Sequence, residues 1–250
     1  MHMRLMPTMI IAGMLIAHAA AAAELSVLSG GAIEPGLKAA AAAFQRETGH
    51  AVRITFNTTP QIRQRIAGGE APDVVIAPPA AIEEFAKAGR LETDRVLVGR
   101  VGLGAAVRPG APVPDISSAD ALRRAVLEAE SIVFNRASTG LYFEELLKKM
   151  GVYDQVASRT TRYPDGASVM EHVLAKGQGR EIGFGPITEI LLYKDKGLRL
   201  VGPLPAEVQN YTSYVAVPML KGSNLDQARA FVRYLGSPAG KALVQAAGIE

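Results

Sequence analysis

The stretch Ile54-Thr55-Phe56-Asn57-Thr58-Thr59-Pro60-Gln61-Ile62-Arg63 joins a β-forming run to a proline that suits a helix start. Pro60 fits the first helical position, because its φ is already helical and its missing N–H would have no partner there. We therefore expect Thr59 to be the N-cap. The unpaired N–H groups of a helix start carry partial positive charge, so this turn is a candidate cradle for an oxyanion or a carboxylate. An ordinary helix cap without a ligand has the same pattern. The anion-binding interpretation therefore requires other turns of this kind to lie close to this one in the fold.

Strand and helix patterns alternate on both sides of this stretch. Apolar runs predict strands over residues 25–29, 52–56 and 74–77. Periodic apolar residues predict helices over residues 35–48, 60–67 and about 80–88, each followed by glycine. Strands that alternate with helices are typical of a parallel sheet covered on both faces, with ligands at the carboxyl ends of the strands.

The alternation continues in a second lobe after a break in the pattern. The apolar run over 96–107 leads into Pro109-Gly110-Ala111-Pro112-Val113-Pro114, which indicates the crossing. Further helices are predicted over 119–129, 141–150, 168–176, 225–235 and 238–247, and strands over 131–134, 181–184, 198–201 and 211–217. The last strand returns the chain to the first lobe. We predict an α/β fold in which residues 24–100 and 211–250 form lobe I and residues 101–210 form lobe II.

Residues 1–23 have the pattern of an export signal. Arg4 precedes an apolar segment over 9–17, and Ala21-Ala22-Ala23 forms a small-residue cleavage site. The apolar segment is shorter than the roughly 20 residues that a membrane span needs, which favours a cleaved signal over a retained anchor. The chain has no cysteine, which excludes disulfides, thiolate chemistry and a lipid anchor. We expect a periplasmic protein, exported with a cleaved N-terminal signal peptide.

Charge and motifs argue against several classes of function. Removal of residues 1–23 leaves 26 basic against 24 acidic residues, a balance that does not favour nucleic acid as a partner. The run Gly236-Ser237-Pro238-Ala239-Gly240-Lys241-Ala242 has the wrong glycine spacing for a phosphate loop. His50 and His172 lack a metal-ligand spacing, and no nucleophile motif occurs. We expect a protein that is not an enzyme and has no cofactor or metal.

Four turns place small residues at predicted helix starts, two in each lobe. They are Ser29-Gly30-Gly31-Ala32, Asn57-Thr58-Thr59-Pro60, Asn135-Arg136-Ala137-Ser138-Thr139-Gly140 and Asp165-Gly166-Ala167-Ser168. A cleft lined by these turns suits a small anion. The guanidinium of Arg136 would grip a carboxylate with two hydrogen bonds, although a surface ion pair is the alternative. Asp165 fits an N-cap better than an anion ligand.

The chain resembles the type II periplasmic solute-binding proteins of ABC importers, in the molybdate-binding-protein-like branch. The similarity lies in the four turns and in several further motifs, namely Gly69-Glu70-Ala71-Pro72-Asp73-Val74-Val75-Ile76-Ala77, Phe85-Ala86-Lys87-Ala88-Gly89-Arg90-Leu91, Ile182-Gly183-Phe184-Gly185, 211–217 and Phe231-Val232-Arg233-Tyr234-Leu235-Gly236-Ser237-Pro238. The resemblance implies two lobes joined by paired hinge strands, which close on a solute and hand it to an inner-membrane ABC permease. We expect a monomer.

The resemblance also implies where the ligands lie. With Asn57 and Arg136 added from their turns, the candidate ligand-binding residues are Gly30, Gly31, Ala32, Asn57, Thr58, Thr59, Arg136, Ser138, Thr139, Gly166, Ala167 and Ser168.

Two departures from the branch bear on the choice of ligand. Molybdate binders usually carry a tyrosine where this chain has Gly183-Phe184-Gly185-Pro186-Ile187, and a serine is common where its first loop has glycine. Together with Arg136, these departures favour a small organic acid over a tetrahedral oxyanion. The alternatives are a molybdate- or tungstate-type importer component, an exported ligand sensor and an exported enzyme on the same fold.

Overall fold

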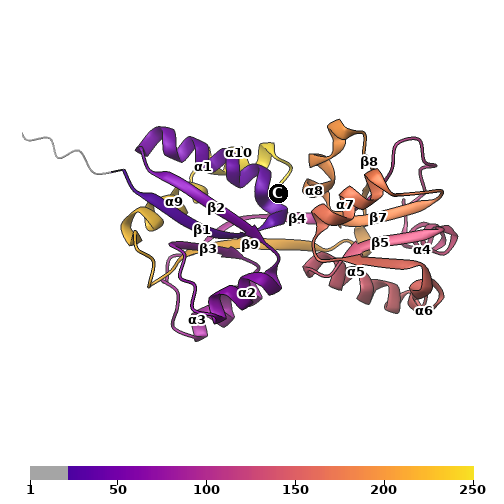
Figure 1. The fold of residues 1–250 in the computed structure, drawn as a ribbon, viewed down its shortest axis with the longest axis horizontal. Helices are drawn as coiled ribbons and strands as arrows, with labels where there is room; N and C mark the ends of the chain where they lie inside the picture. The colour runs from indigo at the N-terminus through magenta and orange to yellow at the C-terminus, as the bar shows by residue number, and fades with distance from the viewer. Residues whose placement is uncertain (1–21) are drawn as a thin grey trace, which may run out of the picture.

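The computed structural model describes residues 22–250, and these form two α/β lobes joined by two long strands (Figure 1). The first lobe contains β1 (Glu24–Gly30), α1 (Glu34–Thr48), β2 (Ala51–Asn57), α2 (Thr59–Ala67), β3 (Val74–Ala77), α3 (Pro79–Lys87), α9 (Leu225–Gly236) and α10 (Pro238–Ala246). The second lobe contains α4 (Ala119–Glu128), β5 (Ser131–Asn135), α5 (Ser138–Lys149), α6 (Tyr153–Val156), β6 (Thr160–Tyr163), α7 (Gly166–Ala175), β7 (Glu181–Pro186), α8 (Ile187–Leu192) and β8 (Arg199–Pro203).

The strands β4 (Val96–Val107) and β9 (Tyr211–Pro218) connect the lobes. The strand order is β2-β1-β3-β9-β4-β7-β5-β6, with β8 also paired to β4. β4 pairs with β9 as far as Gly102 and with β7 from Leu103 onward. The single strand β4 therefore belongs to the sheets of both lobes. The predicted lobe boundaries at residues 100 and 211 stay a prediction.

The pairing register brings the predicted turns together in pairs. β1 and β2 run parallel and end with Gly30 opposite Asn57, while β5 and β6 run parallel and end with Asn135 opposite Tyr163. The first and second turns therefore lie side by side at one edge of the first lobe. The third and fourth turns likewise lie side by side at one edge of the second lobe. The predicted α/β class, with parallel strands at the heart of each lobe, is confirmed.

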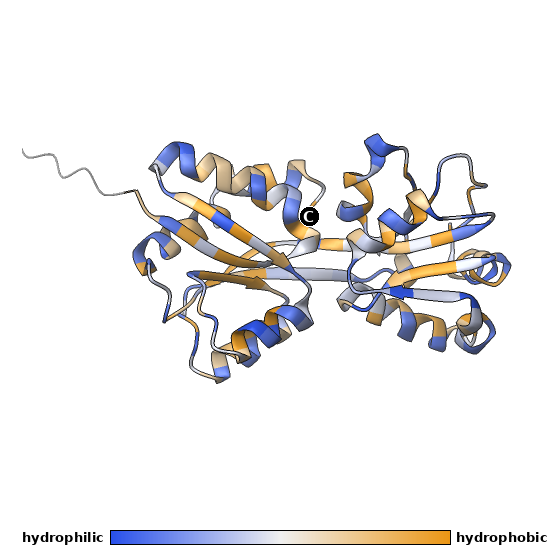
Figure 2. Ribbon diagram, in the orientation of Figure 1, coloured by the Kyte–Doolittle hydropathy of each residue, from blue (hydrophilic) through white to orange (hydrophobic). Residues whose placement is uncertain are grey.

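Each lobe has its own hydrophobic core. In the first lobe, Phe44 of α1 meets Phe231 of α9 edge to face with ring centres 5.1 Å apart. In the second, Phe143 stacks on Phe184 with ring centres 4.0 Å apart. Figure 2 shows hydrophobic stretches in most strands of both lobes, whereas β6 and the helices carry many hydrophilic residues. Burial of these strands and helix faces is the main force that holds each lobe together.

Both ends of the described chain belong to the first lobe. α10 packs against α1, and Val244 and Ile249 are buried in the same core as Leu37. The backbone of Glu250 exchanges hydrogen bonds of 2.7 and 3.0 Å with that of Arg100 on β4. The C-terminal segment is therefore an integral part of this lobe.

The predicted N-cap of α2 is wrong by one residue. The helix begins at Thr59, and its N-cap is Thr58. The side chain of Gln61 explains the shift, since its Oε1 accepts hydrogen bonds from the backbone N–H and the hydroxyl of Thr58, at 2.8 and 3.0 Å. The spacing of Thr58 and Gln61 is that of a capping box, which outweighs the preference of Pro60 for the first helical position.

Other helix boundaries were also misplaced. α5 begins at Ser138 rather than near residue 141, because Oδ1 of Asn135 accepts the N–H groups of Ala137 and Gly140 at 2.9 and 3.0 Å. α7 begins at Gly166 rather than Ser168, with Asp165 as the expected N-cap. The predicted ligands of the third and fourth turns, apart from Arg136, therefore lie within first helical turns. The short elements α6, β6 and α8 were not predicted.

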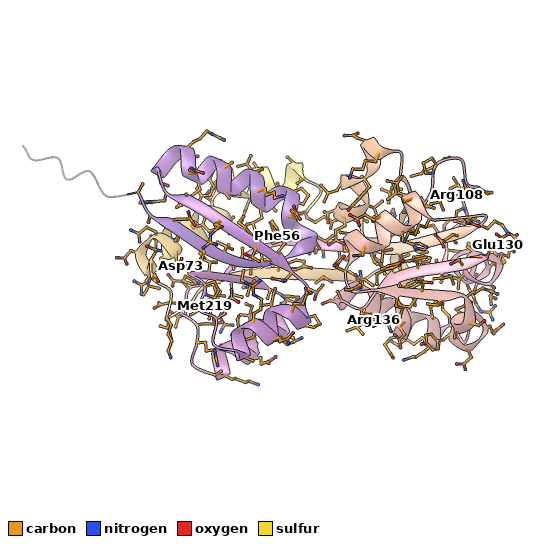
Figure 3. The ribbon with its side chains drawn as sticks, viewed as in Figure 1. Phe56, Asp73, Arg108, Glu130, Arg136 and Met219 are labelled. Atoms are coloured by element: carbon orange, nitrogen blue, oxygen red, sulfur yellow. The ribbon has the colours of Figure 1, made fainter. Side chains whose placement is uncertain are left out.

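Asp73 holds the first lobe together at the entry to β3 (Figure 3). Its buried carboxylate accepts hydrogen bonds from the N–H and hydroxyl of Ser26 at 2.7 and 2.8 Å, and from the N–H of Asn224 at 2.7 Å. Burial alone would raise its pKa, but these hydrogen bonds outweigh burial and hold the pKa below its usual value.

We expect Asp73→Ala to lower the free energy of unfolding by about 3 kcal/mol, because buried donors lose a charged acceptor. The contribution is present above the unfolded pKa of about 4 and is lost as the pH falls through the depressed folded pKa. Urea unfolding of the variant, with Asp226→Ala at an exposed position as control, measures the effect. A loss below about 0.5 kcal/mol would contradict it.

Within residues 22–250, no helix is both long and apolar enough to cross a membrane. The predicted export signal lies, apart from its last two residues, outside the described part of the chain.

Candidate functional site

A cavity of about 240 Å³ lies where the four turns meet. The first lobe and β9 line it with Gly31, Ala32, Glu34, Phe56, Asn57, Thr58, Thr59, Gln61 and Tyr214. The second lobe lines it with Asn135, Ala137, Ser138, Thr139, Asp165, Gly166, Ala167, Pro186 and Glu189. The lining contains hydroxyl, amide and carboxyl groups but no lysine, arginine or histidine. Backbone N–H groups are therefore the groups of the lining that carry partial positive charge.

Three helices begin at the wall of this cavity. Thr59, Ser138 and Gly166 are the first residues of α2, α5 and α7, and all three line it. Each helix start presents N–H groups without intrahelical partners and about half a positive charge. The three first turns together are suited to hold an anion by backbone and hydroxyl donors.

The lobes touch across the cavity. The hydroxyls of Thr59 and Ser138, which come from opposite lobes, are 3.2 Å apart and hydrogen-bonded. A second contact joins the hydroxyl of Thr188 on α8 to the carbonyl oxygen of Ala32. Predicted ligands from the second and third turns are therefore neighbours in space although they are 79 positions apart in the chain.

Glu189 is the most unusual residue of the lining. A Cβ placed on Gly166 would lie 1.7 Å from its Oε2, and one on Gly31 would lie 3.3 Å from its Oε1, so the carboxyl sits between the first and fourth turns. Its Oε2 is buried and has no hydrogen-bond partner among the described residues. Burial, with the nearby charges of Asp165 and Glu34, raises the pKa of Glu189 to about 8.

The other two carboxylates of the lining have partners. Glu34 forms an ion pair with Lys38 one turn along α1. Oδ1 of Asp165 accepts the N–H of Ser168 at 2.8 Å and so caps α7. Glu189 is therefore the carboxyl group of the cavity that is least compensated, and it favours the neutral acid form at pH 7.

Tyr214 brings a phenol to the cavity from the connecting strand β9. Its ring covers Gly30, where an added Cβ would lie 2.4 Å from Cε1 of the tyrosine. This contact explains the glycine in the first loop, since a serine there would displace the ring. Burial, followed by the charge of Glu189, raises the pKa of Tyr214.

Nine of the predicted ligand residues line the cavity together: Gly31, Ala32, Asn57, Thr58, Thr59, Ser138, Thr139, Gly166 and Ala167. Gly30 lies beneath Tyr214, and the N–H of Ser168 is taken by Asp165. Arg136 is exposed and lies at the edge of the second lobe near α5, outside the cavity lining (Figure 3). Participation of these three residues in binding stays a prediction.

Glu189 and Tyr214 are the informative members of the lining that sequence reasoning missed. Glu189 lies two residues beyond the stretch 183–187 that was searched for a tyrosine, in a helix too short to be predicted. A polar Thr188-Glu189 pair directly after a buried strand was the available signal. Tyr214 occupies an expected strand, and only its pairing with the neighbouring strands places it at the cavity.

Among residues 22–250, no group of three or more His, Cys, Asp or Glu side chains is arranged to hold a metal ion.

The fold and the cavity between the lobes define a two-lobed α/β solute-binding protein. The chain belongs to the bacterial extracellular solute-binding protein family, whose model matches residues 25–250. The expected membership of the type II periplasmic solute-binding proteins, in the molybdate-binding-protein-like branch, is confirmed. The fold and the family are those of binding proteins of ABC transporters.

Individual relatives differ in what they act on or bind. An aconitate isomerase of Pseudomonas sp is 28% identical over 257 residues, which covers 98% of this chain and 96% of that protein. The molybdate-binding protein ModA of Azotobacter vinelandii is 26% identical over 245 residues, or 94% of this chain and 92% of that protein. The solved structure of the A. vinelandii periplasmic molybdate-binding protein matches with a TM-score of 0.76 and 19% identity, covering 90% of this chain and 98% of that one.

Proposed function

We propose that this protein is the periplasmic substrate-binding component of an ABC importer and captures a small organic acid between its lobes. The observation that carries the proposal is the convergence of the first turns of α2, α5 and α7 on one cavity. An anion held there would accept hydrogen bonds from backbone N–H groups and from the hydroxyls of Thr59 and Ser138. The loaded protein, a monomer, would pass its solute to an inner-membrane permease.

The cavity of about 240 Å³ leaves room for a small solute. The neutral form of Glu189 can donate a hydrogen bond to an anionic oxygen of either a carboxylate or a tetrahedral oxyanion. The preference for a carboxylate therefore rests on a relative of this chain. The relative named aconitate isomerase points to an organic acid. Arg136 and the missing tyrosine carry less weight, since Arg136 is exposed and Tyr214 supplies a phenol.

Calorimetric titration of the purified protein tests the choice of ligand. The panel contains citrate, succinate and both aconitate isomers against molybdate, tungstate and sulfate. We expect micromolar or tighter binding of at least one carboxylate. Tight binding of molybdate without any response to the carboxylates would instead support the oxyanion alternative.

A second candidate function is the isomerisation of aconitate or a related unsaturated acid. The aconitate isomerase relative and the uncompensated Glu189 in the cavity favour it. An ionised Glu189 would take a proton from the methylene carbon next to the double bond. The double bond would shift by one carbon, and the resulting carboxylic acid would return the proton to the far carbon. A raised pKa makes this carboxylate a stronger base.

Proton NMR in D₂O separates the two candidates. An enzyme would interconvert the aconitate isomers, incorporate deuterium, and lose both activities in Glu189→Gln. A binding protein would bind the acid and leave its isomer and its methylene protons unchanged.

A further inference from the structure

Glu189 projects from α8 into the space between two glycines of opposite lobes. Gly31 and Gly166 leave room for its carboxyl group, and an alanine at position 166 would overlap it. The same carboxyl lines the cavity, while its buried Oε2 has no hydrogen-bond partner among residues 22–250. A buried polar group that lacks a protein partner at a cavity wall is available to a bound molecule.

The groups around Glu189 disfavour its charged form. The titratable neighbours are Asp165 at the start of α7, Glu34 at the start of α1 with its partner Lys38, Tyr214 on β9, and Tyr193 at the end of α8, which is hydrogen-bonded to Glu171. The strands that pack on α8 also carry charged side chains, but these have other partners or face solvent. Arg100 pairs with Glu250, Glu181 pairs with His172, and Arg199 is exposed. The charges nearest to Glu189 are therefore negative.

We propose that Glu189, as the neutral carboxylic acid, contacts the bound solute and donates a hydrogen bond to one of its anionic oxygens, so that capture is linked to one proton. This inference rests on the proposed capture of an anion in the cavity. Glu189 is then a residue that determines which solutes bind. The solutes it favours have an oxygen that can share a proton, as a carboxylate has.

The direction of the pH dependence follows from the raised pKa of about 8. Below that pH the acid is neutral and donates, so affinity for an anion is highest there. Above it Glu189 ionises and repels the anion, so affinity falls as the pH rises, about tenfold for each further unit. Because a bound anion raises the pKa of Glu189 further, binding above pH 8 takes up a proton from the buffer. Tyr214 does not titrate in this window, since burial raises its pKa.

Calorimetry with trans-aconitate and, separately, molybdate as probes tests the inference at about pH 7 and about pH 9.5. We expect the wild-type affinity to fall about thirtyfold between the two. Titrations in two buffers of different ionisation enthalpy should show an uptake approaching one proton at the higher pH and little uptake at the lower.

Glu189→Gln keeps a neutral donor that cannot ionise, so its affinity should change less than about threefold over the same range. Glu145→Gln, at an exposed position on α5 outside the cavity, should reproduce the wild-type profile. An equal affinity of the wild type at both pH values, or a Glu189→Gln profile like that of the wild type, would overturn the inference. If Glu189→Gln does not fold, proton uptake by the wild type decides.

The outcomes also separate this inference from the proposed function. A probe that binds without any pH dependence would remove the role of Glu189 and leave the capture of anions standing. Failure of both probes to bind at either pH would remove both.

Discussion

Replacing Ser138 with Asp is expected to abolish anion binding while leaving the protein at least as stable as the wild type. Ser138 is the first residue of α5, lines the cavity and contacts Thr59 of the other lobe. A carboxylate at a helix N-terminus stabilises the helix by about 0.3–1 kcal/mol. In this cavity, however, it would occupy the place of the anion and repel it. We expect a loss of affinity of more than about a hundredfold, or about 3 kcal/mol.

The control for this prediction is Ser118→Asp. Ser118 caps α4 in the same lobe, where its hydroxyl accepts the N–H of Ala121 at 3.1 Å, and it lies outside the cavity lining. Thermal unfolding and calorimetric titration of both variants should show similar stability and opposite binding behaviour. Near-native affinity of a folded Ser138→Asp variant would mean that anions are held elsewhere.

Gly166→Ala is expected to reduce binding by more than about a hundredfold through the movement of one carboxyl group. The added methyl carbon would lie 1.7 Å from Oε2 of Glu189 and 3.1 Å from Cδ of Pro186, so the glutamate side chain must leave its position at the cavity wall. Overpacking of this kind also destabilises a protein by about 1–3 kcal/mol. Affinity and the free energy of unfolding should therefore fall together.

The double variant Gly166→Ala with Glu189→Ala isolates the cause. Removal of the glutamate side chain makes room for the methyl group, so most of the lost stability should return. Gly68→Ala, at the end of α2 and outside the cavity, controls for the change of a glycine with an ordinary φ of −70°. A double variant as unstable as Gly166→Ala alone would show that Glu189 is not the clashing group.

Much of this fold and most of the candidate site follow from local sequence signals. The strands and helices of the first lobe were predicted nearly to the residue, because glycines and prolines mark their ends. The cavity lining at Thr58, Thr59, Ser138 and Gly166 follows from one repeated pattern, a strand that ends in small residues before a helix.

The missed features depend on tertiary structure. α8 has only six residues, and its formation depends on packing against β4, β7 and α7 rather than on helix propensity. Tyr214 reaches the cavity because β9 crosses between the lobes, which no local pattern reveals. Arg136 stood out by its chemistry, but its backbone N–H bonds to Tyr163 and its side chain is exposed.

The packing of α10 on α1 makes the first lobe discontinuous in the chain. β1, α1 and β2 precede the second lobe in the sequence, whereas α9 and α10 follow it. The core of the second lobe is instead drawn from one continuous segment, residues 103–208. Contacts between distant segments cost more loop-closure entropy than contacts within one segment. We therefore expect the second lobe to refold faster than the first.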